Sequence, residues 1–184
     1  MIHIKQIYRE DYPENKKSTF YYKSNCFYDV EIKTKTQNDG WIIDITKKPF
    51  TEPFIRNIEG FVFETNVNFD KEEYYVALND ENIELGYICV IYQKWHNIAR
   101  LWDIEVNEKF RRQGIGKILL DFMEERARAW KCRIIAIECQ SSNYPAISFY
   151  RKNGYNFTGV DIIAYSNDDI KKCEVKFEMS KKLE

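Results

Sequence analysis

Two glycines and a basic cluster occupy the stretch Val106-Asn-Glu-Lys-Phe-Arg-Arg-Gln-Gly-Ile-Gly-Lys117, where a strand pattern changes to a helix pattern. The first turn of a helix leaves backbone N–H groups without intrahelical partners. These donors and the positive end of the helix dipole favour an anion, and glycine lets a phosphate approach the backbone. The stretch therefore predicts a phosphate site. An ordinary helix start with solvated arginines remains the alternative.

The patterns on either side of this stretch predict an α/β fold. Strands are expected at 73–78, 84–92, 99–106, 133–138, 157–165 and 173–179, with a hairpin turn at 79–82. A second helix is expected at 145–152, with Gly154 beyond its C-terminus. The first helix begins near Gly114, and its apolar residues recur with helical spacing at Ile115, Ile118, Leu119, Phe122, Met123, Ala129 and Trp130. This order indicates a sheet with both parallel and antiparallel pairs.

The first seventy residues are less clearly patterned. Strands are expected at 27–33 and 41–45, and the segment 49–63 is expected to be helical. The sequence has no repeat and no linker, and 184 residues is the size of one ordinary domain, roughly 100–200 residues. We therefore expect a single domain over 1–184.

Composition and charge exclude several classes of protein. There are 28 Lys plus Arg against 29 Asp plus Glu, which argues against a nucleic-acid partner held by a broad basic face. No apolar run approaches the roughly 20 residues that span a bilayer, and the N-terminus lacks a secretory apolar stretch. We expect a cytoplasmic protein with no membrane partner. The five cysteines form no C-x-x-C pair and His3 lies far from His96, so we expect no metal.

A second motif follows one helix and one strand later, Asn143-x-x-Ala-Ile-x-Phe-Tyr150-x-x-x-Gly-Tyr155. Together with Arg111-x-x-Gly114-x-Gly116, it resembles the GNAT superfamily of acetyl-CoA-dependent N-acetyltransferases, over roughly residues 73–179. The resemblance implies a mixed, mostly antiparallel sheet flanked by helices, with a splayed central strand pair that binds CoA. It also implies acetyl-CoA as the cosubstrate.

Three further segments are similar to the streptothricin acetyltransferases within that superfamily: Trp102-Asp103-Ile104, Ile137-Glu138-Cys139-Gln140, and Gly159-Val160-Asp161 followed by Tyr165. There are departures. Trp102 stands where those enzymes tend to have a second acid, and Lys176-Phe177 replaces an aromatic pair. The first seventy residues show no match, so the resemblance supports the cosubstrate more firmly than the acceptor.

The resemblance implies roles for the residues around the glycines. Backbone amides of 112–117 would hold the CoA pyrophosphate, with charge from the arginines nearby. The cosubstrate-binding residues are then Arg111, Arg112, Gln113, Gly114, Ile115, Gly116 and Lys117. The sheet would splay at 104–106, so that Ile104 and Val106 also line the cosubstrate. A backbone N–H there, that of Val106 or a neighbour, would polarise the thioester carbonyl.

Tyr150 is the expected general acid. A thiol has a pKa near 8.5 and a tyrosine about 10, so the phenol can donate a proton to the leaving thiolate. The alternative is an aromatic core residue. Asn143 is expected to hydrogen-bond the pantetheine arm of the cosubstrate, and a plain helix-cap role fits it equally well.

Four carboxylates are candidates for acceptor recognition. Asp103 and Glu105 lie two apart on one strand and project to the same face. Glu138 lies on the next strand and Asp161 on the one after. Carboxylates attract a cation and accept its proton, although each could instead be solvated or ion-paired. The resemblance to the streptothricin acetyltransferases covers Asp103 and Glu138, so it implies substrate contact for both. Glu105 is the candidate base, and Asp161 and Tyr165 are assigned to the pocket wall, with a core role as the alternative for Tyr165.

The sequence thus predicts an N-acetyltransferase that acetylates a primary amine of a small cationic molecule by direct attack. Streptothricin is the named candidate, which would make the protein an antibiotic-resistance enzyme. Two alternatives stay open: a peptide or protein acetyltransferase similar to the ribosomal-protein N-acetyltransferases, and a CoA-binding sensor without turnover. By analogy with GNAT relatives, a homodimer is considered, formed through an edge strand such as 173–179.

Overall fold

The computed structural model describes residues 1–12, 14–35, 37, 39–63 and 70–183. The chain divides into two compact units. Unit 1 consists of Met1–Phe20, Ile58–Ile137 and Ser180–Glu184, and unit 2 consists of Tyr21–Asn57 and Glu138–Met179. The single domain expected from the sequence stays a prediction.

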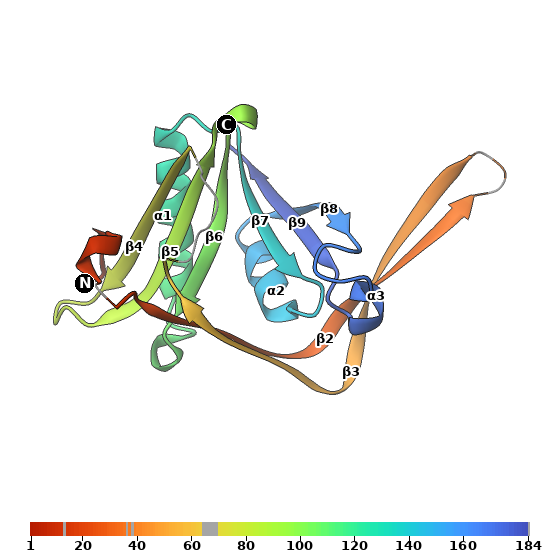
Figure 1. Ribbon diagram of the computed structural model, residues 1–184, viewed down its shortest axis with the longest axis horizontal. Helices are drawn as coiled ribbons and strands as arrows, with labels where there is room; N and C mark the ends of the chain where they lie inside the picture. The colour runs from red at the N-terminus through yellow and green to blue at the C-terminus, as the bar shows by residue number, and fades with distance from the viewer. Residues whose placement is uncertain (13, 36, 38, 64–69, 184) are drawn as a thin grey trace. The chain divides into compact units, whose positions relative to one another are not determined.

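The described strands form a seven-stranded sheet and a two-stranded ribbon (Figure 1). The order in the sheet is β1 (His3–Ile7), β4 (Lys71–Leu78), β5 (Glu84–Gln93), β6 (Ile98–Val106), β7 (Ile134–Gln140), β9 (Lys176–Lys182) and β8 (Asn156–Asp161). The ribbon consists of β2 (Lys17–Lys35) and β3 (Gly40–Phe61). The helices are α1 (Ile115–Ala129), α2 (Tyr144–Lys152) and α3 (Asp169–Lys172), with 3₁₀ turns at η1 (Arg9–Asp11), η2 (Lys94–His96) and η3 (Glu108–Phe110).

The pairing of the strands confirms the predicted fold class. β1, β4, β5 and β6 pair antiparallel in that order, and β6 pairs with β7 in parallel. The β6–β7 ladder is short, because it runs from Ile98↔Ile134 only to Leu101↔Ile137. β6 continues to Val106, and over that stretch its described ladder is with β5. The predicted splay of the central strand pair would begin at this point.

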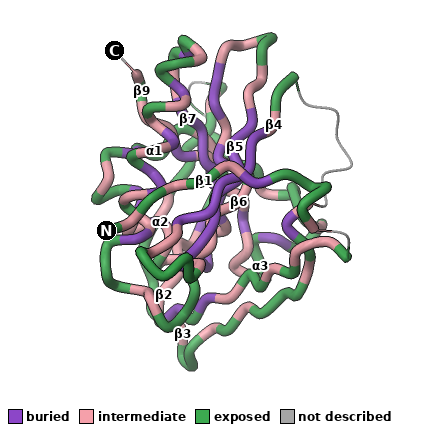
Figure 2. The backbone as a smooth tube through the Cα atoms, turned by 90° about the vertical axis from the view of Figure 1, so that its left-hand side faces the viewer, coloured by how far each residue is buried: buried purple, intermediate pink, exposed green. Residues whose placement is uncertain are grey.

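Helix α1 covers one face of the sheet in unit 1 by packing against β5 and β6. Its buried residues, spaced mostly four apart, are Ile115, Leu119, Leu120, Met123 and Ala127. The rings of Tyr75 on β4 and Phe122 on α1 lie 4.6 Å apart, so Tyr75 faces the helix. Its neighbour Tyr74 therefore faces away, as do Tyr87 and Cys89, which are in register with that face of β4. β5 is buried over most of its length (Figure 2).

The helix expected at 49–63 is wrong, because residues 49–61 belong to strand β3 and residues 62–63 form a turn. Phe50 and Phe54 are four residues apart, a spacing that places two side chains on one face of a helix and also on one face of a strand. In unit 2 the ring of Phe50 lies 4.6 Å from Phe27 on β2, and that of Phe54 lies 5.9 Å from Tyr22. These cross-strand contacts favour the ribbon.

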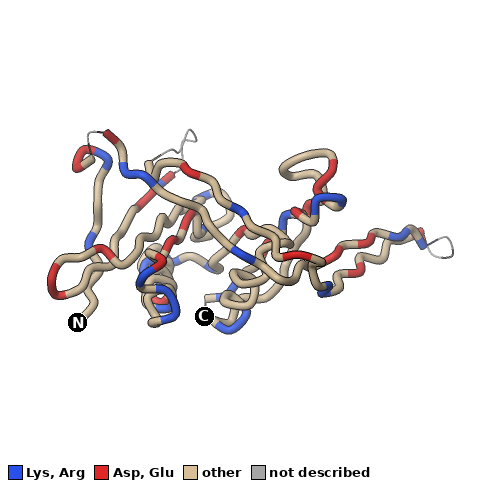
Figure 3. Tube along the Cα trace, turned by 90° about the horizontal axis from the view of Figure 1, so that it is seen from below, with Lys and Arg blue, Asp and Glu red and all other residues tan. Residues whose placement is uncertain are grey.

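Residues of both charge signs lie along the ribbon (Figure 3). Lys48 pairs with Asp29 across the strands at 2.5 Å, and Lys33 pairs with Glu31 at 2.6 Å. Such solvent-exposed pairs contribute little to stability. Pro49 fits β3 because a strand with a free edge leaves part of its N–H groups outside the ladder.

The last two predicted strands have different bounds in the structure. β8 ends at Asp161, so Tyr165 lies beyond it, and α3 occupies Asp169–Lys172. Cys173 caps α3 with a φ of 57°, and β9 begins only at Lys176. β9 also lies between β7 and β8 in the strand order, so it offers no free edge. The proposed dimer edge at 173–179 is therefore wrong, and a homodimer stays a prediction.

Candidate active site

The start of α1 in unit 1 has the features of an anion site. Gly114 is its N-cap, with a φ of 87° and no side-chain cap. The N–H of Ile118 donates to the Gly114 carbonyl at 3.1 Å, so the N–H groups of Ile115, Gly116 and Lys117 precede the first bond of the helix. A Cβ atom built at Gly114 would meet nothing within 4 Å. The residues therefore leave room for a phosphate against the backbone, as the sequence predicts.

The basic side chains of this loop have different environments. Arg111 donates from Nε to the Val106 carbonyl at 3.0 Å, which ties the loop to the end of β6. Lys117 forms an ion pair with Asp121 at 2.6 Å on the same helix. Gln113 donates to the Lys109 carbonyl at 3.3 Å. Arg112 is exposed, with a φ of 64°. The arrangement makes Arg112 the side chain best placed to reach a ligand in solvent.

A β-bulge reshapes the end of β6. Cys89 pairs with Asp103 but Val90 pairs with Leu101, so Trp102 is the extra residue of the bulge. Bulges increase local twist and redirect side chains, and they are frequent next to active sites. Ile104 and Val106, the predicted cosubstrate contacts, follow the bulge and pair with Ile88 and Gly86. The sequence alone does not indicate this bulge.

Asp103 and Glu105 lie together on the face of β6 opposite α1, as predicted, because they pair with Cys89 and Tyr87. The Tyr87 hydroxyl donates to Asp103 Oδ2, and the Thr19 N–H donates to Glu105 Oε2 at 3.1 Å. Neither carboxylate has a lysine or arginine within ion-pair distance in the described part of the chain. Their negative charge is therefore available to a cation.

The environment makes both acids better proton acceptors than free carboxylates. Burial raises the pKa of Asp103, against the opposing effect of the Tyr87 hydrogen bond. Burial also raises the pKa of Glu105, and the nearby Asp103 adds to that rise. A general base is most effective when its pKa approaches the working pH. The structure thus supports proton transfer at this pair without assigning the base to one member.

In unit 2 the structure brings Glu138 and Tyr165 together. The Tyr165 hydroxyl donates to Glu138 Oε1 at 2.8 Å, and Lys176 Nζ lies 3.5 Å from Oε2. Glu138 thus already has a cationic neighbour, which weakens its attraction for a second cation. Asp161 is exposed and accepts the N–H of Ile163 at 3.1 Å. The two predicted carboxylates of this unit are each engaged by the protein.

Asn143 caps the N-terminus of α2, and Tyr150 lies in the last turn of this helix. Asn143 is the N-cap, and its side chain accepts the Ala146 N–H at 3.2 Å, which is the cap role considered from the sequence. Tyr150 is only 6% exposed, and its ring lies 5.5 Å from Phe149 and 6.2 Å from Tyr155. Both residues are therefore held rigidly. Their roles toward a cosubstrate stay predictions.

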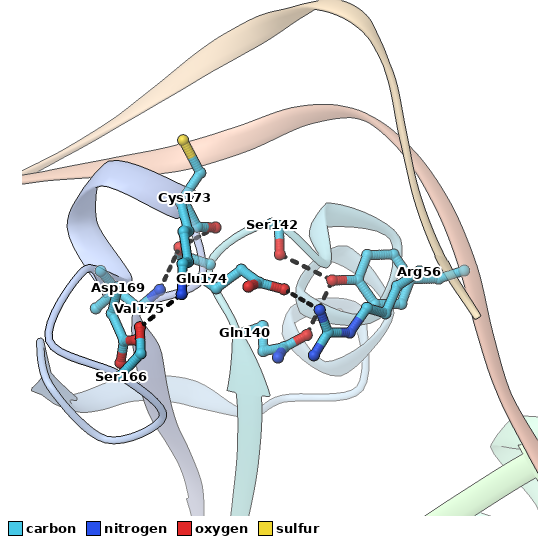
Figure 4. A network of polar contacts seen from close by, with 11 residues as sticks. Arg56, Gln140, Ser142, Ser166, Asp169, Cys173, Glu174 and Val175 are labelled. Carbon is cyan, nitrogen blue, oxygen red and sulfur yellow. Dashed lines mark hydrogen bonds and ion pairs between the residues drawn. The ribbon is translucent and has the colours of Figure 1, made fainter. Parts of the chain in front are cut away.

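A polar network at the end of β7 was not found from the sequence (Figure 4). The Tyr22 hydroxyl lies 2.9 Å from Gln140 Oε1 and 2.8 Å from Ser142 Oγ, and Arg56 pairs with Glu174 at 2.7 Å. Tyr22 and Arg56 belong to the first seventy residues, where no motif pointed to them. Gln140 was recognised only as part of a motif.

Two expected absences concern metals and membranes. Among residues 1–12, 14–35, 37, 39–63 and 70–183, no cluster of three or more His, Cys, Asp or Glu is arranged to hold a metal ion. In the same residues no helix has the length and apolarity to cross a membrane. Neither observation bears on the reaction.

Gly86 gives a direct test of how β5 fixes the acid pair. A Cβ atom at this position would overlap the Glu105 carbonyl oxygen and lie 3.1 Å from Val106 Cα. We expect Gly86→Ala to lower the free energy of unfolding by about 1–3 kcal/mol, measured by chemical denaturation. Gly159→Ala is the control, because its Cβ would meet Glu178 Cβ at an ordinary 3.5 Å. Equal stability of the two variants would contradict the close approach of β5 to β6.

Comparison with known sequences gives the same family as the motifs. The sequence profile of the acetyltransferase (GNAT) family matches residues 2–155. Streptothricin acetyltransferase A of Bacillus subtilis (strain 168) is 30% identical over 137 residues, which is 71% of this chain and 74% of the relative. Streptothricin acetyltransferase of Streptomyces lavendulae is 32% identical over 91 residues, 50% of this chain. The match spans about half of that relative's length, 48%.

Solved structures show the same fold. Nourseothricin acetyltransferase superposes with a TM-score of 0.75 at 22% identity, covering 98% of both chains. A Bacillus anthracis str. Ames protein assigned to the streptothricin acetyltransferases, solved in complex with acetyl coenzyme A, superposes with a TM-score of 0.73 at 23% identity, covering 100% of this chain and 98% of the other. At these identities the likeness concerns the fold alone. The profile match over residues 2–155 shows that the chain belongs to the acetyltransferase (GNAT) family.

Proposed function

We propose that the chain transfers acetyl from acetyl-CoA to a primary amine of a small cationic acceptor of the streptothricin class. The continuous segment 103–117 of unit 1 carries this proposal. Its first part holds two carboxylates without a lysine or arginine partner among the described residues, and its last part holds the open N-terminus of α1. The carboxylates suit an ammonium group, and the helix N-terminus suits a pyrophosphate.

Each residue then has one task. The backbone N–H groups of 112–117 bind the pyrophosphate, and Arg111 and Arg112 add positive charge near it. Glu105 accepts a proton from the acceptor ammonium, and Asp103 shares the ammonium charge. The backbone N–H of Val106 or its neighbour polarises the carbonyl under attack. Acetyl-CoA supplies the activated acetyl group.

The family resemblance implies the remaining roles for residues that belong to unit 2. Tyr150 donates a proton to the departing thiolate. Asn143 orders the start of α2 and hydrogen-bonds the pantetheine arm. Glu138, Asp161 and Tyr165 line the acceptor side. Because Lys176 lies next to Glu138, Glu138 contributes less than a free carboxylate would to binding the cationic acceptor. The streptothricin class is chosen because two relatives are named for that substrate and because the open acid pair favours a cation.

The test is the mass of the product. The protein is incubated with acetyl-CoA and, in separate reactions, streptothricin, an aminoglycoside, a polyamine and a peptide with a free N-terminus. We expect streptothricin to gain one acetyl group and Glu105→Gln to reduce that gain strongly. Acetylation of the peptide alone would contradict the proposed acceptor. No acetylation anywhere, with acetyl-CoA bound in a direct titration, would favour a sensor.

A further inference from the structure

Three tyrosines in the described part of unit 1 donate a hydroxyl hydrogen to a carboxylate: Tyr74 donates to Glu72, and Tyr75 and Tyr87 do so on opposite faces of the sheet. Tyr75 donates to Glu73 at 2.5 Å on the face that packs against α1. Tyr87 donates to Asp103 on the other face. Arg126 also holds Glu73, whereas no lysine or arginine pairs with Asp103 among the described residues. The Tyr75–Glu73 contact therefore belongs to the core, and the Tyr87–Asp103 contact belongs to the candidate site.

The side chain of Tyr87 is itself held in place by its buried surroundings. Tyr87 is only 3% exposed, and the Ser18 side chain lies next to its hydroxyl. The next residue, Thr19, donates its N–H to Glu105, which is directly opposite Tyr87 in the β5–β6 register. The start of β2 thus holds Asp103 through Tyr87 and Glu105 directly. The sequence motifs assign no role to the three supporting residues, Ser18, Thr19 and Tyr87.

We propose that Tyr87 is a positioning residue, which holds one oxygen of Asp103 so that Asp103 and Glu105 together receive the acceptor's primary ammonium group. This inference rests on the proposed function. An ammonium group has three N–H donors, so it can bond to two carboxylates at once. Glu105 then accepts one proton as the N–H bond breaks, which leaves the neutral amine with its lone pair and Glu105 as a carboxylic acid. Tyr87 keeps its own proton throughout.

The groups around Asp103 set the pH dependence of this arrangement. They are Tyr87 and Cys89 on β5, Glu72 and Tyr74 on β4, Glu105 on β6, Ser18 and Thr19 on β2, and Lys16 and Arg111 nearer to Glu105. Lys16 is paired with Glu84 at 2.7 Å. Asp103 therefore has no cationic partner among the described residues, and its charged form is favoured by the hydrogen bonds from the Tyr87 hydroxyl and the Ile104 backbone.

The variant Tyr87→Phe tests the inference. A hydrogen bond to a carboxylate favours its charged form, so its removal raises the pKa of Asp103. We expect KM for the acceptor to rise about tenfold and KM for acetyl-CoA to stay unchanged. The acid limb of kcat/KM against pH should move to higher pH. Tyr75→Phe is the matched control, and it should lower stability without moving that limb.

Two further measurements separate positioning from a structural role. In an Asp103→Asn background, adding Tyr87→Phe should change KM for the acceptor no further, because the carboxylate it holds is gone. Ser18→Ala should raise that KM in the same direction while keeping the Tyr87 ring. A full additional loss in the double variant would overturn the inference.

An NMR titration of the Asp103 carboxyl carbon provides a readout without turnover. Its midpoint should move to higher pH in Tyr87→Phe and stay in place in Tyr75→Phe. An unmoved midpoint, or an unchanged acceptor KM in an active enzyme, would overturn the role of Tyr87. Absence of acetyl transfer by the unmodified protein, with the midpoint shift present, would instead overturn the proposed function together with the positioning role.

Discussion

Replacing Tyr150 by phenylalanine is expected to lower kcat about 100- to 10,000-fold, because the leaving thiolate loses its proton donor. The affinity for acetyl-CoA should stay unchanged. The ring of Tyr150 is buried between Phe149 and Tyr155 at the end of α2, and phenylalanine keeps this packing while removing only the hydroxyl. The loss should therefore appear in turnover, while the packing of the ring is retained.

The pH dependence of this loss distinguishes acid catalysis from packing. Above about pH 10 an ordinary phenol is ionised and can no longer donate a proton to a leaving thiolate. The ratio of wild-type to Tyr150→Phe kcat should therefore shrink as the pH rises through this range, as measured by steady-state kinetics. Tyr155→Phe is the control, because Tyr155 is a buried tyrosine in the same unit with no assigned role. Equal rates for wild type and Tyr150→Phe would remove Tyr150 from the mechanism.

The regular elements around the glycines could be predicted because local patterns determine them. Helix α1 follows from apolar residues spaced three and four apart, and its start follows from the glycine-containing stretch around Gly114. The error at 49–63 has an equally local origin. Phe50 and Phe54 fit one face of a helix or of a strand, and only the partner strand β2 decides between them. That partner is distant in sequence and carries no motif.

The site was predictable where one strand or one helix end supplies it. Asp103 and Glu105 share a face by strand alternation alone, and Asn143 caps α2 by its position before Tyr144-Pro145. Tyr87 could not be assigned from sequence, because its contact with Asp103 depends on the β5–β6 register and on the bulge at Trp102. A shift of that register by one residue would turn Tyr87 to the opposite face.

The engagement of Glu138 was also beyond the sequence. Tyr165 and Lys176 lie 27 and 38 residues further along the chain, and their contacts with Glu138 require the loop after β8 and the pairing position of β9. A carboxylate that belongs to a family motif can thus be partly neutralised by a lysine of the same protein. Asp103 and Glu105 are therefore stronger candidates than Glu138 for binding a cationic acceptor.

Glu73→Gln is expected to lower the free energy of unfolding by about 3 kcal/mol, the largest effect on stability that we predict. Glu73 is 6% exposed on β4 and binds Arg126 of α1 through two hydrogen bonds of 3.0 Å. Tyr75 donates to it at 2.5 Å, and Lys71 lies 2.9 Å away. The glutamine would leave the partly buried guanidinium of Arg126, whose side chain is 29% exposed, without this matching charge, and urea denaturation measures the loss.

The exposed ion pair on α1 supplies the matched control. Lys117 and Asp121 lie 2.6 Å apart, with side chains 61% and 53% exposed. Water screens this pair, so Asp121→Asn should change the free energy of unfolding by less than about 0.5 kcal/mol. Similar losses in the two variants would contradict the assignment of Glu73 to a buried network.

The pH dependence of stability follows from the same contacts. Burial raises the pKa of Glu73, but the hydrogen bonds from Tyr75, Lys71 and Arg126 outweigh it, so the folded-state pKa lies below its ordinary value. A carboxyl with a lowered pKa stabilises the fold above its unfolded pKa, about 4.3, and this contribution disappears as the pH falls through the folded pKa. The difference in unfolding free energy between wild type and Glu73→Gln should therefore be constant near neutral pH and narrow below about pH 4.3. A difference that persists undiminished in acid would mean that the charge of Glu73 is not what holds α1 to β4.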